Sequence, residues 1–173
     1  GHLPPHCMPY VSPTFTADMV LEALQRMSND SSCGVDGWRV CELKCLPREI
    51  LERLAQLYNC VEAVGRWPDA LTTGLISMLN KGEGLQAKHL RPITTTSILY
   101  RIWSATRVKE VLCWQEQWAS SSLLGFRHAH GCEDAYWQIA LEIEAAHVFN
   151  RPLCGISIDF EKAFDRVPLH FVL

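Results

Sequence analysis

The sequence lacks several features that would place it in a specialised class of protein. It has no apolar run approaching the roughly 20 residues of a membrane span, no internal repeat and no low-complexity tract. The opening residues, GHLPPHCMPY, have neither the basic nor the apolar region of a secretory signal peptide. With 173 residues, 48% of them hydrophobic, the chain is long enough to bury a core. We therefore expect a soluble, intracellular, globular protein.

The Cys-x-x-Cys spacing of many zinc sites is also missing, although the chain has eight cysteines. Two groups of metal-type side chains occur, one made of His2, His6 and Cys7 and the other of His128, His130 and Cys132. Neither has a second ligand pair at zinc-finger spacing, so we expect no structural zinc. Because most cysteines lie in apolar segments, we expect reduced, buried thiols and not a disulfide framework.

Charge is unevenly distributed along the chain, and one segment is basic. The formal net charge is -3, but residues 81–109 hold six basic side chains and one acidic side chain. The flanking regions, 1–70 and 110–173, each contain nine acidic side chains and are net negative. The basic segment is either a solvated helix face or a surface for phosphate groups.

Capping residues and apolar spacing predict the secondary structure in outline. Thr16 is a candidate N-cap, Pro47 suits a first helical turn, and Gly65 suits a helix end. SNDSSCGVDGW, at 28–38, reads as a loop, and the long helix expected at 95–118 would expose Arg101, Arg107 and Lys109. We expect, in order, helices within 12–27 and 47–65, a strand at 71–79 that begins a hairpin with Lys81 at its tip, helices at 95–118 and 132–149, and a strand at 153–160.

The last predicted strand ends in a carboxylate. Alternation along a strand places Cys154, Ile156, Ile158 and Phe160 on one face, and Gly155, Ser157 and Asp159 on the other. Asp159 would then stand at the strand end beside small neighbours, a position suited to coordinating a charged group. Alternatively, it caps the helical turn that follows.

The string DFEKAFDRVP at 159–168 resembles motif A of the reverse transcriptases of non-LTR (LINE-type) retroelements. Further segments resemble the same family in the same order, from about Thr16 to the last residue. The sequence departs from the pattern at two places. Asn80 stands where the family often has Pro, and a Ser- and Leu-rich run replaces the Gln that often precedes Gly-Phe-Arg. The other matching segments are GVDGW, GRWPDAL, LISMLNKGEG, HLRPITTTSILYRIW and GFRHAHGCEDA.

The resemblance implies an α/β (α+β) fold that comprises the fingers and the beginning of the palm of a right-hand polymerase. We expect the chain to be an incomplete, N-terminal portion of the reverse transcriptase domain, ending just after motif A. The implied divisions are an N-terminal extension at 1–15, a helical part at 16–70, fingers at 71–150 and the start of the palm at 151–173.

The activity implied by the resemblance is transfer of nucleotides from dNTPs to a DNA primer on an RNA template. Two Mg²⁺ ions would stabilise the attacking and leaving oxygens. Asp159 would be one metal ligand, with the backbone carbonyl of Phe160 as a second, and Phe164 would be a steric gate against ribose. Lys81 and Arg91 would neutralise the triphosphate.

Three further residues have expected roles. Arg101 and Arg127 are expected to contact nucleic acid. Asp165, on the turn after the strand, is expected to point away from the metals and to have a structural role.

The Tyr/Phe-Ala-Asp-Asp hairpin that supplies the second metal carboxylate in this family does not occur in the 173 residues. We therefore expect this chain alone to be inactive, while its parent protein acts in the nucleus. One alternative is a non-catalytic, RNA-binding module retained from a retroelement. A Cys/His hydrolase is another, supported only by scattered Cys and His side chains.

Overall fold

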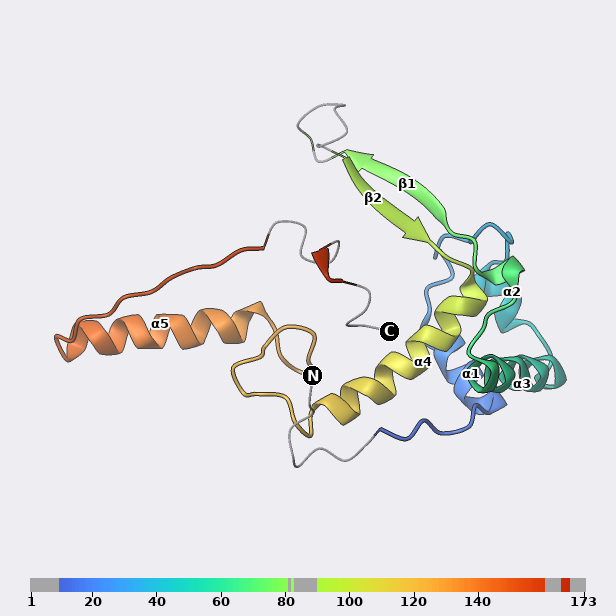
Figure 1. The fold of residues 1–173 in the computed structure, drawn as a ribbon, viewed down its shortest axis with the longest axis horizontal. Coiled ribbons are helices and arrows are strands. Elements are labelled where there is room, and N and C mark those ends of the chain that lie inside the picture. The colour runs from blue at the N-terminus through green and yellow to red at the C-terminus, as the bar shows by residue number, and fades with distance from the viewer. Residues whose placement is uncertain (1–9, 81, 83–89, 161–165, 169–173) are drawn as a thin grey trace. The chain divides into compact units, whose positions relative to one another are not determined.

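The structure is a computed structural model that describes residues 10–80, 82, 90–160 and 166–168. The chain divides into two compact units, one running to Ser120 and the other beginning at Ser121. Within the described residues, the first unit contains four α-helices and one hairpin, and the second contains one α-helix (Figure 1). Mixed helix and antiparallel strand agree with the expected α+β class.

The first helix, α1 (Ala17–Arg26), begins where the sequence predicts. Thr16 is extended, and its hydroxyl oxygen accepts a hydrogen bond from the Met19 amide at 3.3 Å. Asp18 lies in the first turn, where a negative charge interacts favourably with the helix dipole. Val20 and Leu24, one turn apart, are fully buried, so α1 turns one apolar face toward the core.

The third helix, α3 (Arg48–Val64), also has the predicted ends. It follows Pro47 and stops at Gly65, whose φ of 70° is the left-handed conformation that glycine adopts without steric cost. A short helix, α2 (Val40–Lys44), precedes it and was not expected from the sequence. The Glu42 carboxylate caps α2 by accepting a hydrogen bond from the Arg39 amide at 2.9 Å.

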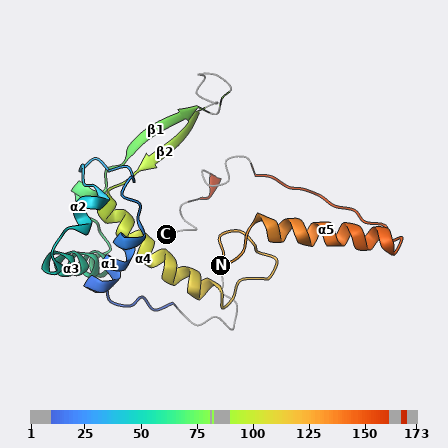
Figure 2. The same cartoon turned by 180° about the vertical axis from the view of Figure 1, so that it is seen from behind.

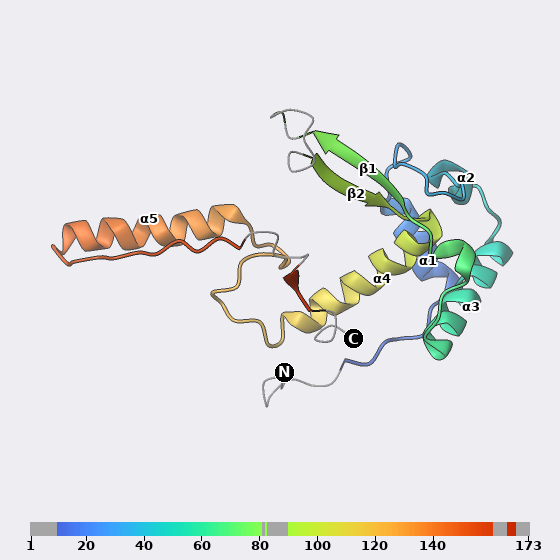
Figure 3. The same cartoon turned by 45° about the horizontal axis from the view of Figure 1, so that its top comes forward.

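The predicted hairpin is present and leads into a long helix. After a 3₁₀ turn, η1 (Asp69–Leu71), strand β1 (Leu75–Asn80) pairs antiparallel with β2 (Leu90–Thr95). Helix α4 (Ile98–Gln115) begins three residues after β2. Seen from behind in Figure 2 and from above in Figure 3, the hairpin extends away from the helices of its unit.

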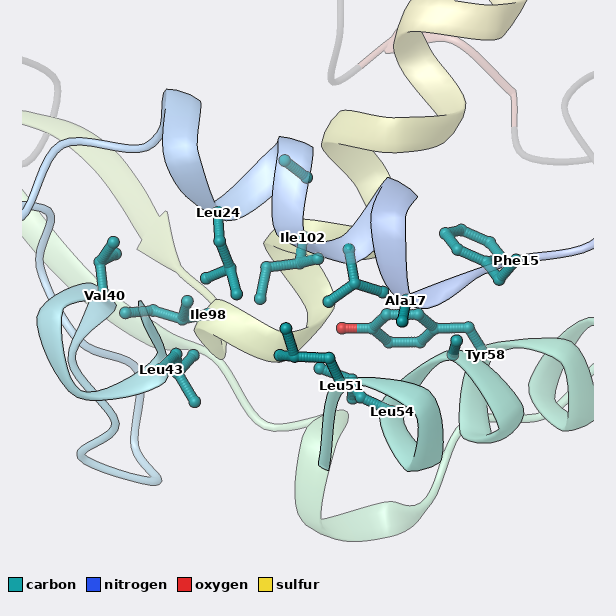
Figure 4. Close-up of a cluster of buried hydrophobic side chains, with 13 residues drawn as sticks. Phe15, Ala17, Leu24, Val40, Leu43, Leu51, Leu54, Tyr58, Ile98 and Ile102 are labelled. Carbon is teal, nitrogen blue, oxygen red and sulfur yellow. The ribbon is translucent and has the colours of Figure 1, made fainter. Parts of the chain in front are cut away.

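A single hydrophobic core holds α1, α2, α3 and the start of α4 together (Figure 4). Tyr58 of α3 lies at its centre, fully buried, and its hydroxyl donates a hydrogen bond to the Leu99 carbonyl at 2.7 Å. Burial of this many apolar side chains is the main driving force for folding of the first unit. The core comprises Phe15, Ala17, Val20, Ala23, Leu24, Val40, Leu43, Leu51, Leu54, Ala55, Tyr58, Ile98 and Ile102.

The second unit contains α5 (Cys132–Val148) and an extended segment, 151–160, that runs alongside it (Figures 1 and 3). The Asp134 carboxylate caps α5 by accepting from the Gly131 amide at 2.8 Å. No residue of α5 is buried. An open, mainly apolar groove of about 800 Å³ lies between Ile139 to Ile143 and Leu153 to Gly155.

Three expectations are wrong. Residues 153–160 are not a strand: no described segment pairs with them, and Ile156 and Ile158 are 90% and 75% exposed. A strand needs a neighbour to satisfy its backbone groups. Arg107 is buried at 7% exposure. The expected burial of the thiols is also wrong, because only Cys33 of the seven described cysteines is even half-buried.

None of the helices within the described residues combines the length and apolarity needed to cross a membrane.

Candidate functional site

Arg91 is the second residue of β2 and lies near the loop end of the exposed hairpin. It sits on β2 directly opposite Leu79 of β1, and its side chain is exposed. Among the described residues it makes no ion pair. A guanidinium with free donors on an exposed arm is suited to bind phosphate oxygens. Lys81, predicted to act beside it at the hairpin tip, lies outside the described residues, so its position relative to Arg91 stays a prediction.

Asp159 and Phe160 are both exposed at the end of the extended segment of the second unit. Asp159 makes no ion pair within the described part of the chain. Across these described residues no three His, Cys, Asp or Glu side chains gather at metal-binding distance. One carboxylate fits a single ligand position for Mg²⁺ but cannot anchor two ions. Phe164 and Asp165 lie outside the described residues.

Arg101 contacts the backbone of the 28–38 loop, and Arg127 contacts the backbone of its own loop. Arg101 donates through Nη2 to the Ser32 carbonyl, while its Nε is buried without a hydrogen-bond partner. Arg127 donates through Nη1 to the Leu123 carbonyl at 3.1 Å. It follows Phe126, which is 83% exposed with a φ of 58°. Their contacts with nucleic acid stay predictions.

The GVDG segment, residues 34–37, contacts the N-terminal end of α4 at the base of the hairpin. Ser97, the N-cap of α4, is 2% exposed, and its hydroxyl donates to the Asp36 carboxylate at 2.5 Å while accepting from the Leu99 amide at 3.1 Å. Gly34 lies so close that a Cβ there would be 2.7 Å from the Ser97 backbone. Since α4 begins three residues after β2, these contacts fix where the hairpin leaves the helices.

The RWPD segment, residues 66–69, packs against α4 through the aromatic ring of Trp67. The Trp67 ring lies 5.1 Å from that of Tyr100 and 5.3 Å from that of Trp103, in tilted and edge-on geometry. Such pairs add to the stabilisation from burial. Both ends of the hairpin are thus attached to α4, from which the arm carrying Arg91 extends.

Comparison with known proteins supports the resemblance carried by these motifs. No protein-family model matches the chain. It is 26% identical over 153 residues to the probable RNA-directed DNA polymerase from transposon BS of Drosophila melanogaster. It is 24% identical over 153 residues to the probable RNA-directed DNA polymerase from transposon X-element of the same species.

The chain is thus similar in sequence to two probable RNA-directed DNA polymerases of transposons. Both alignments cover 86% of this chain, so the relationship extends well beyond motif A. The chain spans 17% of the length of each of these relatives.

The reverse transcriptase motifs did not reveal a partly buried ionic cluster around Arg107 of α4. Arg107 makes a two-pronged contact with Glu62 of α3, with both N–O distances at 2.6 Å. It also donates to Glu110 at 2.6 Å and to the Pro13 carbonyl at 2.8 Å, and its guanidinium lies 4.0 Å from the centre of the Phe15 ring. The cluster ties the segment before α1 to α3 and α4.

The cluster shifts the pKa of Glu62 and that of Tyr10 at its edge. Partial burial disfavours the Glu62 carboxylate, but hydrogen bonds from Arg107 and Trp103 outweigh it, so the pKa of Glu62 is lowered. At the edge of the cluster, the Tyr10 hydroxyl donates to Glu110 at 2.8 Å. Partial burial and this hydrogen bond raise the pKa of Tyr10. No local signal in the sequence marks this cluster, because Arg107 lies in a largely polar stretch of α4, SATRVKE, and its partner Glu62 is 45 residues away.

Proposed function

We propose that this chain supplies the nucleotide-binding arm and the first metal ligand of a reverse transcriptase that copies RNA into DNA. Support comes from the relationship to transposon RNA-directed DNA polymerases over 86% of the chain. The observation that carries the proposal is Arg91, exposed without an ion pair among the described residues on an arm anchored to the core at its base.

Each residue would have a distinct part in the reaction. Lys81 and Arg91 would neutralise the incoming triphosphate, where Arg binds planar phosphate oxygens with two parallel hydrogen bonds. Asp159 and the Phe160 carbonyl would bind Mg²⁺, which stabilises charge on the reacting phosphate. Phe164 would exclude a ribose 2'-hydroxyl by its bulk. Arg101 and Arg127 would contact the template and primer backbones.

This chain by itself is proposed to be inactive in polymerisation. Asp159 is one carboxylate, and two Mg²⁺ ions need at least two carboxylates to anchor them. No Ala-Asp-Asp string occurs in the sequence. The test is primer extension by the purified chain on an RNA template with Mg²⁺ and dNTPs. We expect no incorporation above background, and template-dependent incorporation would overturn this part of the proposal.

Binding of RNA without catalysis is the second candidate function. The observation that favours it is that the first unit has its own hydrophobic core and carries the exposed Arg91. Such binding would depend on salt, because cationic side chains release counterions from the nucleic acid. Salt-dependent RNA affinity that falls on Arg91→Ala and Lys81→Ala would support it.

A further inference from the structure

The two edges of the hairpin differ in their ability to accept another strand. Pro92 lies opposite Met78. Because proline has no N–H, it fits an antiparallel ladder where its nitrogen faces away from the partner strand. The outer edge of β2 therefore lacks a donor at its middle. By the same alternation, the backbone groups of Ile76, Met78 and Asn80 face the outer edge of β1, where each has its N–H.

Nothing in the β1 sequence protects its outer edge against pairing with another strand. Among the described residues the sheet has two strands, and every residue of β1 is exposed. Natural edge strands are usually guarded by a charge, a proline or a bulge. The β1 sequence, LISMLN, contains neither charge nor proline. Leu75, Ile76, Met78 and Leu79 are all more than half exposed, at 53%, 60%, 61% and 51%.

We propose that the chain forms a twofold symmetric dimer in which β1 pairs antiparallel with β1 of a second copy. A register centred on Ser77 places apolar side chains opposite each other on both faces, with Ile76 facing Met78 and Leu75 facing Leu79 of the second copy. The absence of charge in β1 means that no like charges meet. The outer edge of β2 stays blocked by Pro92, so the four-stranded sheet closes as a dimer and does not extend into a fibre.

The alternation of the strands also gives the dimer one polar feature. Arg91 shares a face of the hairpin with Leu75, Ser77 and Leu79, because it lies opposite Leu79. A twofold axis perpendicular to the sheet keeps both copies of that face on the same side. The dimer would therefore present two Arg91 side chains on one surface. The proposed dimer does not depend on the proposed function.

The first test uses proline to block the edge of β1. In Met78→Pro, the new proline would face outward opposite Pro92, so the variant loses no hydrogen bond within the hairpin. We expect the 173-residue chain to sediment as a concentration-dependent dimer and Met78→Pro as a monomer. Thr94→Pro, placed on the edge that is already blocked, is the matched control and should remain dimeric. A wild-type chain that is monomeric at all concentrations, or a Met78→Pro dimer, would overturn the proposal.

A second test does not depend on how proline affects folding. In the proposed register Ser77 lies directly opposite its own copy at a non-hydrogen-bonded position, where Cα atoms are about 4.5 Å apart, within the range of a disulfide. Mild oxidation of Ser77→Cys should yield a peptide that is disulfide-linked to its own copy through position 77, detected by mass spectrometry. Leu79→Cys is the control, because residue 79 faces residue 75 of the second copy and should not link to itself. Equal cross-linking of the two variants would contradict this register.

Discussion

The Ser97 hydroxyl donates a hydrogen bond to the Asp36 carboxylate at 2.5 Å, across 61 residues of sequence. This contact joins the GVDG loop to the first turn of α4, close to the point where the hairpin enters the core. A loop motif that resembles one in reverse transcriptases thus has a structural task here, which is to hold the base of the arm that carries Arg91.

Replacing Asp36 should loosen this attachment. We expect Asp36→Ala to lower the free energy of unfolding by about 1 kcal/mol, the typical net value of one hydrogen bond. Amide exchange in β1 and β2 should become faster at the same time. Asp30→Ala removes an exposed acid from the same loop and is the control. Equal effects of the two substitutions, measured by denaturant unfolding, would show that the contact with Ser97 has no special role.

Gly34 should not tolerate a side chain. A Cβ at this position would lie 2.7 Å from backbone atoms of Ser97, which cannot rotate away as a side chain would. Gly34→Ala should therefore lower the free energy of unfolding by about 1–3 kcal/mol, as overpacking does. Gly125→Ala is the comparison, because a Cβ there meets nothing within 4 Å. An unchanged denaturation midpoint for Gly34→Ala would contradict the close contact.

Arg107 should be difficult to replace, even by lysine. Its guanidinium binds both oxygens of Glu62 and reaches Glu110 and the Pro13 carbonyl, a geometry that a lysine ammonium cannot reproduce. We expect Arg107→Ala to cost about 1.5–3 kcal/mol, the range for hydrogen bonds to charged groups, and Arg107→Lys to cost part of this. Full stability of Arg107→Ala in urea would contradict the cluster's role.

The same cluster predicts a dependence of stability on pH. The pKa of Glu62 is lowered from its ordinary value of 4.5 in the folded chain, so its contribution is complete above pH 4.5 and is lost as pH falls through the folded value. Glu62→Gln should therefore be less stable than wild type at neutral pH, with the difference shrinking below pH 4.5. A difference that stays constant from neutral pH to well below this value would contradict the lowered pKa.

Much of the first unit could be predicted from local signals. Thr16 and Gly65 mark the start of α1 and the end of α3 because capping and left-handed φ are requirements of a few neighbouring residues. The hairpin followed from a short Thr- and Ile-rich run and nearby glycines. Helix α2 was missed because its five residues are too few to show a period.

The rest depended on contacts distant in the sequence. The side chain of Arg107 turns inward because Glu62 and Glu110 neutralise it, and no local pattern reveals a partner on another helix. Alternation correctly describes faces of a strand, but residues 151–160 have no strand beside them among the described residues. A metal-binding role for Asp159 follows only from the resemblance to motif A and stays a prediction.

The most direct test of the central claim, that the hairpin binds phosphate groups of nucleic acid or nucleotide, measures affinity for single-stranded RNA against salt concentration. We predict that Arg91→Ala weakens binding and reduces the slope of log affinity against log salt by about 0.7, the value for one phosphate contact on a single strand. Arg53→Ala, which removes an exposed cation from α3, should leave both unchanged. Affinity and slope that are the same for wild type, Arg91→Ala and Arg53→Ala would contradict the claim.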